Sequence, residues 1–150
     1  MEIEEVIKTT SQMELSTKTV INLMYTCRVI EERILGVLKP YGLSIQQYNV
    51  LRILRGQKSN PCSVSKLQSR MIDRNSNTTR LIDKLLSKGL VKRQVCEQNR
   101  RKVELFITTE GLDVLEQLDP LILENNQNLI SQLDKSQLDS LNIYLNTIRN

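Results

Sequence analysis

The stretch that decides the fold reads DRNSNTTRLIDKLLSKGLV, from Asp73 to Val91. Its apolar residues recur every three or four positions, which places them on one face of a helix and the polar residues on the other. Gly89 follows the last apolar pair and ends such a helix, because glycine readily adopts the left-handed conformation of a C-terminal cap. The stretch therefore predicts an amphipathic helix with one exposed, polar side.

The residues just before this stretch predict a second, shorter helix. Cys62–Met71 is too short to be stable alone, and Ser63 is a suitable N-terminal cap for two helical turns. A tight turn at Ile72–Asn75 then leads into the amphipathic helix. Two short helices joined by a tight turn form a helix-turn-helix.

Two segments with the character of β-strands follow Gly89. Val91–Val95 and Val103–Ile107 alternate apolar and polar residues or contain β-branched ones. The polar segment between them, Glu97–Lys102, ends in three consecutive cations. We therefore predict a β-hairpin with a basic tip, which turns the helix-turn-helix into a winged helix.

Long helices are predicted on both sides of this winged-helix lobe, which spans residues 44–110. Residues 16–38 and 112–150 each carry an apolar seam with alternating spacings of three and four, and the second is expected to bend at Pro120. A small lobe cannot cover both seams, so we expect the first and last helices of two chains to pair as a homodimer; an intramolecular bundle is the alternative. Residues 1–15 predict a frayed arm or a short helical lead-in. The expected helix caps are Ser44, Ser63 and either Thr108 or Thr109.

Charge is distributed unevenly along the 150 residues. The net charge is +4, yet residues 62–108 alone contain eleven Lys and Arg against four Asp and Glu, a balance of +7, and the remaining residues sum to −3. A basic segment between acidic ends is typical of a surface that meets nucleic-acid phosphate. A solvated charged face is the alternative interpretation.

The residue types argue against catalysis and metal binding. The chain has no histidine, the commonest general base and metal ligand. An enzyme that uses carboxylates, such as Glu31 and Glu32 with Arg28, stays an alternative, although adjacent acids on a helix point in different directions. We therefore expect no enzyme, no catalytic residue, no metal and no cofactor.

Cysteine usage and hydropathy favour a cytoplasmic protein. Three cysteines lie more than thirty residues apart, at Cys27, Cys62 and Cys96, so we expect reduced thiols that take part in packing. The N-terminus is acidic, unlike a secretion signal, and no apolar run approaches the length of a membrane span. We expect no membrane contact.

The order of these elements resembles the MarR (multiple antibiotic resistance regulator) family of bacterial transcription factors, from about Ser16 to Ile148. Asp73–Val91 is similar to the family's recognition helix with its L-x-x-K-G-L-V exit, and Leu105–Gly111 parallels the L-T-x-x-G signature. Asn99-Arg100-Arg101 parallels the D-x-R signature of the wing, with Asn99 in place of the aspartate. An amide there lacks the carboxylate's charge, but it still forms hydrogen bonds and shapes the turn.

The resemblance implies one mainly α MarR-like domain over residues 1–150, with dimerisation helices at 16–38 and 112–150. It further implies a transcription regulator that binds a pseudo-palindromic double-stranded DNA operator as a homodimer, a repressor that a small ligand releases. A winged-helix module that binds another protein instead of DNA is the alternative. For such a module we expect an affinity for its protein partner that is insensitive to salt.

Base contact is expected from the N-terminal turns of the amphipathic helix, because a helix about 10 to 12 Å wide fits the DNA major groove. The candidates for base contact are Ser76, Asn77, Thr79 and Arg80. Lys66 and Lys84, with Arg70 and Lys88, flank that surface and are expected at phosphates. Asp83 lies on the same face, where a carboxylate weakens binding unless it accepts from a cytosine or pairs with Arg80 or Lys84.

The hairpin tip supplies the other candidate DNA contacts, Arg100 and Arg101. An arginine at such a tip enters the adjacent minor groove or binds the flanking phosphates. The resemblance implies that Arg101 is the wing residue that meets DNA.

The resemblance also implies a small aromatic or phenolic ligand in a crevice between the dimerisation and DNA-binding parts. Tyr25, Arg28 and Tyr48 are the candidate lining residues, with core packing as the alternative role for each. Cys27 falls on the apolar seam, where a thiol is poorly ionised, so we do not expect it to act as a redox sensor.

Overall fold

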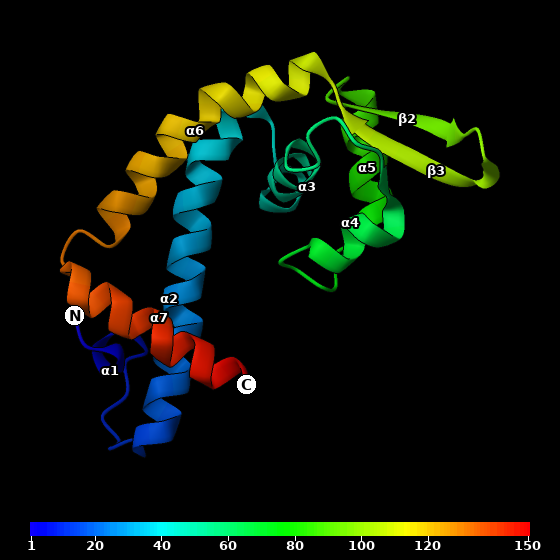
Figure 1. Ribbon diagram of the computed structural model, residues 1–150. Helices are drawn as coiled ribbons and strands as arrows, with labels where there is room; N and C mark the ends of the chain where they lie inside the picture. The colour runs from blue at the N-terminus through cyan, green and yellow to red at the C-terminus, as the bar shows by residue number, and fades with distance from the viewer.

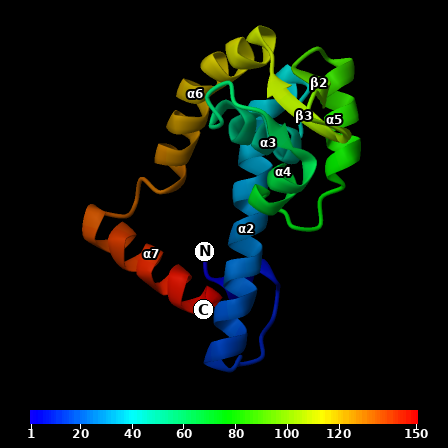
Figure 2. The ribbon, with the colours of Figure 1, turned by 45° about the vertical axis from the view of Figure 1, so that its right-hand side comes forward.

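The computed structural model describes residues 1–150 and is predominantly helical, with one small antiparallel sheet (Figure 1). The elements in chain order are α1 (Ile3–Val6), α2 (Leu15–Leu38), the 3-10 helix η1 (Lys39–Tyr41), α3 (Ile45–Arg55), β1 (Cys62–Ser63), α4 (Val64–Arg70), α5 (Thr78–Ser87), β2 (Val91–Cys96), β3 (Asn99–Ile107), α6 (Thr109–Leu129) and α7 (Lys135–Arg149). Figures 1 and 2 show α3, α4, α5 and the sheet gathered in one lobe, while α2, α6 and α7 extend away from it. The predicted winged helix-turn-helix with long helices at both ends is confirmed.

Side-chain caps begin the helices where the sequence predicts them. The Ser44 hydroxyl accepts the backbone N–H of Gln47, whose side chain accepts the Ser44 N–H in return, so a capping box starts α3. Ser63 and Thr108 cap α4 and α6 by accepting an N–H three residues further on. Pro120 lies inside α6 without ending it, and Figure 1 shows the helix arched along its length.

The sheet contains a strand that the sequence analysis did not predict. Its order is β1-β3-β2, and β1 pairs antiparallel with β3 through Cys62↔Leu105 and Ser63↔Glu104. Two residues are too few to show a strand period, and their pairing depends on how the chain folds back. The sequence predicts Cys62 at the start of the short helix instead.

The core lies in the lobe and takes in the first half of α6. Leu51 of α3, Leu67 of α4, Leu85 of α5, Leu105 of β3 and Leu115 of α6 are all fully buried. Since side chains from five elements meet there, the core fixes the position of α5 against the sheet and against α6.

The three cysteines differ in their environments, and no disulfide joins them. Cys62 is buried in the core, and burial raises the pKa of its thiol, so it packs as an apolar residue. Cys27 is exposed on α2, so within a single chain the predicted packing role for Cys27 is wrong. Its helix face has no neighbour in the same chain.

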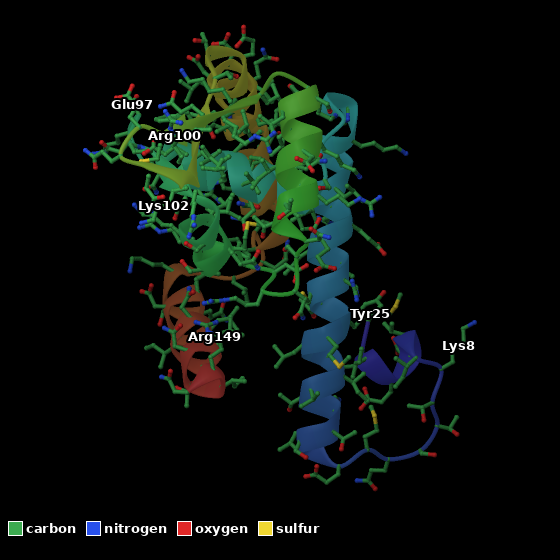
Figure 3. All side chains as sticks on the ribbon, turned by 90° about the vertical axis from the view of Figure 1, so that its right-hand side faces the viewer. Lys8, Tyr25, Glu97, Arg100, Lys102 and Arg149 are labelled. Atoms are coloured by element: carbon green, nitrogen blue, oxygen red, sulfur yellow. The ribbon has the colours of Figure 1, made fainter.

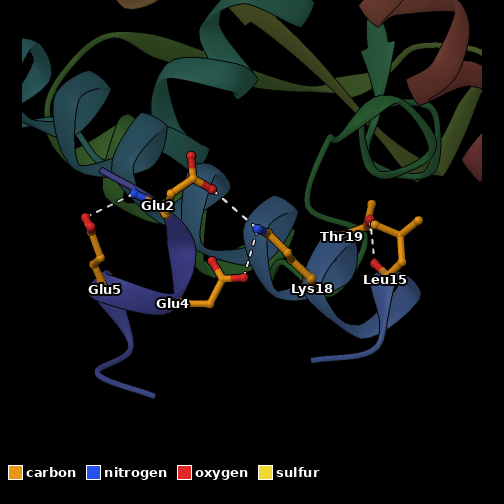
Figure 4. A network of polar contacts seen from close by, with 6 residues as sticks. All are labelled: Glu2, Glu4, Glu5, Leu15, Lys18 and Thr19. Atoms are coloured by element: carbon orange, nitrogen blue, oxygen red, sulfur yellow. Dashed lines mark hydrogen bonds and ion pairs between the residues drawn. The ribbon is translucent and has the colours of Figure 1, made fainter. Parts of the chain in front are cut away.

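The first residues are folded against α2 rather than frayed. Ile3 is buried, and the Lys18 ammonium lies 2.8 Å from a Glu4 oxygen and 3.3 Å from a Glu2 oxygen (Figure 4). The hydrogen bond from Lys18 lowers the pKa of Glu4. Contacts between residues far apart in sequence thus stabilise a segment that has little periodicity of its own.

Large apolar side chains remain exposed on α2 and α7. No residue of α7 is buried, and Ile143 and Ile148 are each 62% exposed, while Val20 and Met24 of α2 are 54% and 67% exposed. Figure 2 shows α7 standing apart from α2 along most of its length. None of the helices combines the length and the apolar character that a bilayer crossing demands.

Candidate nucleic-acid interface

The polar face of α5 points away from the core. Ile82 and Leu85 are buried against the lobe, whereas Thr79, Arg80 and Lys84 are exposed. No carboxylate lies within ion-pair distance of Arg80 or Lys84. Both cations are therefore free to meet an anionic partner.

The two candidate residues before α5 take part in local hydrogen bonds. Asn77 caps the helix, because its side-chain oxygen accepts the Arg80 backbone N–H at 3.1 Å. The Ser76 hydroxyl is partly buried and donates to the Asp73 carbonyl at 2.6 Å. Asn77 keeps its amide N–H2 group for another partner, whereas Ser76 has already used its donor hydrogen.

The hairpin of β2 and β3 is longer than the sequence predicts. Only Glu97 and Gln98 separate the strands, so Arg100 and Arg101 lie in β3 and not in a loop. The Asn99 side-chain oxygen accepts the Arg101 backbone N–H at 3.1 Å. The amide thus shapes this end of the hairpin, as the sequence analysis expected.

An irregularity in β3 carries the three consecutive cations. The register moves from Val95↔Val103 to Cys96↔Asn99, which leaves Arg100–Lys102 as an insertion in β3. Extra residues in one strand redirect the side chains around them. Figure 3 looks along the hairpin toward the lobe and labels Glu97, Arg100 and Lys102 on its exposed side.

The flanking lysines have different environments. Lys66 on α4 is exposed and makes no ion pair. Lys88 instead donates from its ammonium to the Gly42 carbonyl at 2.5 Å. This bond ties the end of α5 to the junction between α2 and α3, so Lys88 is not the free phosphate contact that the sequence analysis expected.

Asp83 is paired with a residue that the sequence analysis did not select. Its carboxylate lies 3.9 Å from the guanidinium of Arg93 on β2, not beside Arg80 or Lys84. Alternate residues of a strand share a face, so Arg93 points to the same side as the buried Val91. The alternation along β2 was the one signal in the sequence that could have pointed to Arg93. It does not show that Asp83 is the residue with which Arg93 pairs.

The three candidate ligand-binding residues do not meet in one place. Tyr48 is buried in the lobe with the Arg52 guanidinium 5.8 Å from its ring centre, and burial raises the pKa of its hydroxyl. Tyr25 is exposed on the part of α2 beside α1, where it lines a small groove with Ile3 (Figure 3). Arg28 alone lines the larger crevice between α2 and the lobe.

That crevice has a volume of about 760 Å³. Its lining comes from α2, α3 and the turn before α5: Arg28, Glu31, Glu32, Leu35, Ser44, Ile45, Gln46, Asn49, Ile72 and Asp73. The Arg28 guanidinium is 2.8 Å from Glu31, which leaves Glu32 and Asp73 without an ion-pair partner. No three His, Cys, Asp or Glu side chains in the molecule are arranged to hold a metal ion.

Comparison with known proteins identifies the lobe. A family model described as MarR family matches residues 43–103, from the residue before Ser44 to the middle of β3. The crystal structure of a MarR transcription factor from Planctomyces limnophilus is 27% identical and covers 91% of this chain and 99% of its own, with a TM-score of 0.71. Residues 43–103 thus form a lobe of the MarR family.

Two further proteins are similar to this chain. The HTH-type transcriptional regulator PecS of Dickeya dadantii is 25% identical over 122 residues, which cover 80% of this chain and 73% of PecS. The S. aureus MepR–DNA complex shares the fold, with a TM-score of 0.79 and 18% identity over 91% of this chain and 97% of that one. The curated relatives are transcription regulators rather than enzymes, and this chain is a DNA-binding regulator.

Replacing Asp83 by Asn tests how this carboxylate affects the interface. The change removes one negative charge beside the exposed cations and frees Arg93, so we expect affinity for all duplex sequences to rise by about two- to fivefold with a steeper salt dependence. Fluorescence anisotropy at several salt concentrations measures both quantities. The matched control is Glu116→Asn, which removes an exposed carboxylate from α6; an equal rise there contradicts a local role for Asp83.

Proposed function

We propose that this protein reads double-stranded DNA by placing α5 in the major groove and the β2–β3 hairpin against the adjacent minor groove or backbone. The observation that carries the proposal is that exposed, unpaired cations of α5 and the cationic insertion of β3 belong to one lobe. A helix about 10 to 12 Å wide fits the major groove, and its first turns reach the base edges.

The residues divide into those that read bases and those that hold the backbone. Arg80 and Thr79 project freely from the first turns of α5, and the Asn77 amide group lies beside them. We assign these three to base edges, because arginine and asparagine donate to guanine and adenine there. Ser76 completes the turn before the helix. Lys66, Lys84, Arg100 and Arg101 are assigned to phosphates or to the minor groove.

A homodimer is the proposed binding form. The exposed apolar faces of α2 and α7 lie outside the winged-helix core, and burying them against a second copy stabilises both chains. A twofold pair of lobes places its reading helices about one DNA turn, roughly 34 to 36 Å, apart. The operator is then pseudo-palindromic, and occupancy of such a site represses transcription when it blocks access to a promoter.

Charged substitutions in α7 test the dimer. Leu141 and Leu145 lie on its apolar seam, and replacing both by Asp puts two charges into the proposed interface, where burying an unpaired charge is strongly unfavourable. We expect the parent to sediment as a dimer and the double variant as a monomer. A parent chain that sediments as a monomer at micromolar concentration rules out the twofold arrangement.

Alanine variants of Arg80 and Arg101 separate base reading from backbone contact. Arg80→Ala is expected to lose about 1 to 3 kcal/mol on the preferred site and to relax preference at one position per half-site. Arg101→Ala is expected to weaken binding to most sequences alike and to make the salt slope shallower by about one phosphate per subunit. Equilibrium titrations against specific and scrambled duplexes at several salt concentrations measure these effects.

Lys135→Ala is the control for these titrations, since it removes an exposed cation from α7, outside the lobe. Its affinity and salt slope should match those of the parent. Unchanged affinity and salt slope in both arginine variants would contradict the DNA assignment. The winged helix would then be a protein-binding module, whose affinity is insensitive to salt.

A second proposal concerns the crevice beside α2. We propose that it takes a small aromatic or phenolic ligand whose binding releases DNA. Leu35, Ile45 and Ile72 offer apolar contact, and the unpaired Glu32 and Asp73 favour an uncharged or cationic compound over an anion. Because the crevice includes the turn that leads into α5, an occupant there is able to move the reading helix.

Calorimetric titration with three probes of similar size tests the crevice. Phenol and benzylamine are expected to bind more tightly than benzoate, and to weaken DNA affinity by a coupling of about 1 to 3 kcal/mol. Because the Glu32 carboxylate attracts a cation, benzylamine should bind more tightly than phenol. Glu32→Gln should reduce this preference, whereas Tyr25→Phe should leave it unchanged. Tightest binding of benzoate, or an unchanged preference in Glu32→Gln, contradicts the assignment.

A further inference from the structure

One ion pair connects the winged-helix lobe with the long helices. The Arg55 guanidinium at the end of α3 donates two parallel hydrogen bonds to the Asp119 carboxylate of α6, at 2.7 and 3.0 Å. The other ion pairs lie within the lobe, within α2, within α7, or between α2 and the N-terminal segment. Residues 64 positions apart in sequence are thus joined in a fixed relative orientation.

The environment of this pair strengthens it beyond an ordinary surface contact. The side chains of Arg55 and Asp119 are 35% and 46% exposed, so part of each is shielded from water. The hydrogen bonds that Arg55 donates to the Asp119 carboxylate raise the pKa of Arg55. A bidentate arginine–carboxylate pair also has a defined geometry, because both groups are planar and their two bonds are parallel.

The position of Asp119 allows the ion pair to affect the direction of α6. Pro120 follows it immediately, and proline removes one backbone hydrogen bond and makes a helix prone to bend there. Leu115 and Leu118 hold the first half of α6 by apolar packing, whereas Ile122 is the one buried residue beyond Pro120. Apolar packing is non-directional, so the directional bonds of Arg55 restrict rotation beside Pro120, where a helix is prone to bend.

We propose that Arg55 and Asp119 are positioning residues that set the angle between the winged-helix lobe and the α6–α7 arm, and through it the separation of the two reading helices on DNA. This inference rests on the proposed homodimer. Neighbouring base pairs of a duplex are only about 3.4 Å apart, so a small rotation of the lobe is enough to move α5 by one base-pair step. Loss of the pair therefore alters half-site spacing without altering how one half-site is read.

A spacing series measures this angle directly. Duplexes carry two copies of the preferred half-site at different centre-to-centre separations, and a further duplex carries one half-site alone. Fluorescence anisotropy gives the dissociation constant of the full-length protein for each duplex. The variants are Asp119→Asn, which loses the charge, and Arg55→Lys, which keeps the charge but loses the two parallel bonds.

Both variants are expected to bind the single half-site as the parent does. At the optimal spacing they should bind about fivefold more weakly, the loss expected for a well-formed bidentate pair, and their spacing preference should broaden. The double exchange Arg55→Asp with Asp119→Arg should restore a sharper profile. The control is Asp139→Asn, which breaks an exposed 2.7 Å ion pair within α7 and should leave the profile unchanged.

Circular dichroism and sedimentation accompany each titration. An unchanged spacing profile in both variants overturns the proposal. An equal loss on the single half-site, or a shift to monomer, also overturns it, because the pair would then stabilise the lobe or the dimer rather than set an angle. A parent that shows no preference for paired half-sites contradicts the homodimer function itself, and that failure appears in the parent alone.

Discussion

The placement of α5 depends on the hydroxyl group of Thr108. It donates to the Gly89 carbonyl at 2.7 Å, just past the end of α5, and accepts the Gly111 N–H at 3.1 Å at the start of α6. The Thr108 backbone N–H bonds to the Leu90 carbonyl at 3.1 Å. A Cβ atom at Gly111 would lie 2.3 Å from that same carbonyl oxygen, so only glycine allows α5, β3 and α6 to meet this closely.

The molecule divides into a lobe with its own buried core and long helices with exposed apolar faces. Inside the lobe, Leu51, Leu67 and Leu85 are fully buried, and the core needs no partner. Outside it, α7 has no buried residue, and α2 exposes Val20 and Met24. The lobe therefore holds the proposed DNA-contacting surface as a preformed unit, while the long helices present apolar faces that a second copy is able to cover.

Polar residues near the interface divide in the same way, between those that hold the backbone and those that remain free. Asn77 caps α5, Ser76 closes the turn before it, and Lys88 holds the α2–α3 junction. The side chains of Arg80 and Lys84 hold no backbone group in this way and remain exposed. Residue type alone does not separate these groups, because a side chain suited to DNA is equally suited to a backbone carbonyl or N–H group.

The sequence by itself determined the helices, their caps, the hairpin and the basic middle of the chain. These features follow from local signals: the spacing of apolar residues, Ser and Thr before a helix, and the count of charges between residues 62 and 108. The resemblance to the MarR family added the expectation that Arg101 meets DNA. Asn99 was correctly expected to shape the hairpin because an amide and a carboxylate both accept a backbone N–H.

Only the tertiary structure decided which residues meet across long separations. It paired Asp83 with Arg93, placed Cys62 in a strand, separated Tyr25 from Tyr48, and joined Arg55 to Asp119. The period of a helix or strand specifies the face on which a side chain lies. It does not specify what lies opposite that face, because this depends on how the elements pack around the shared core.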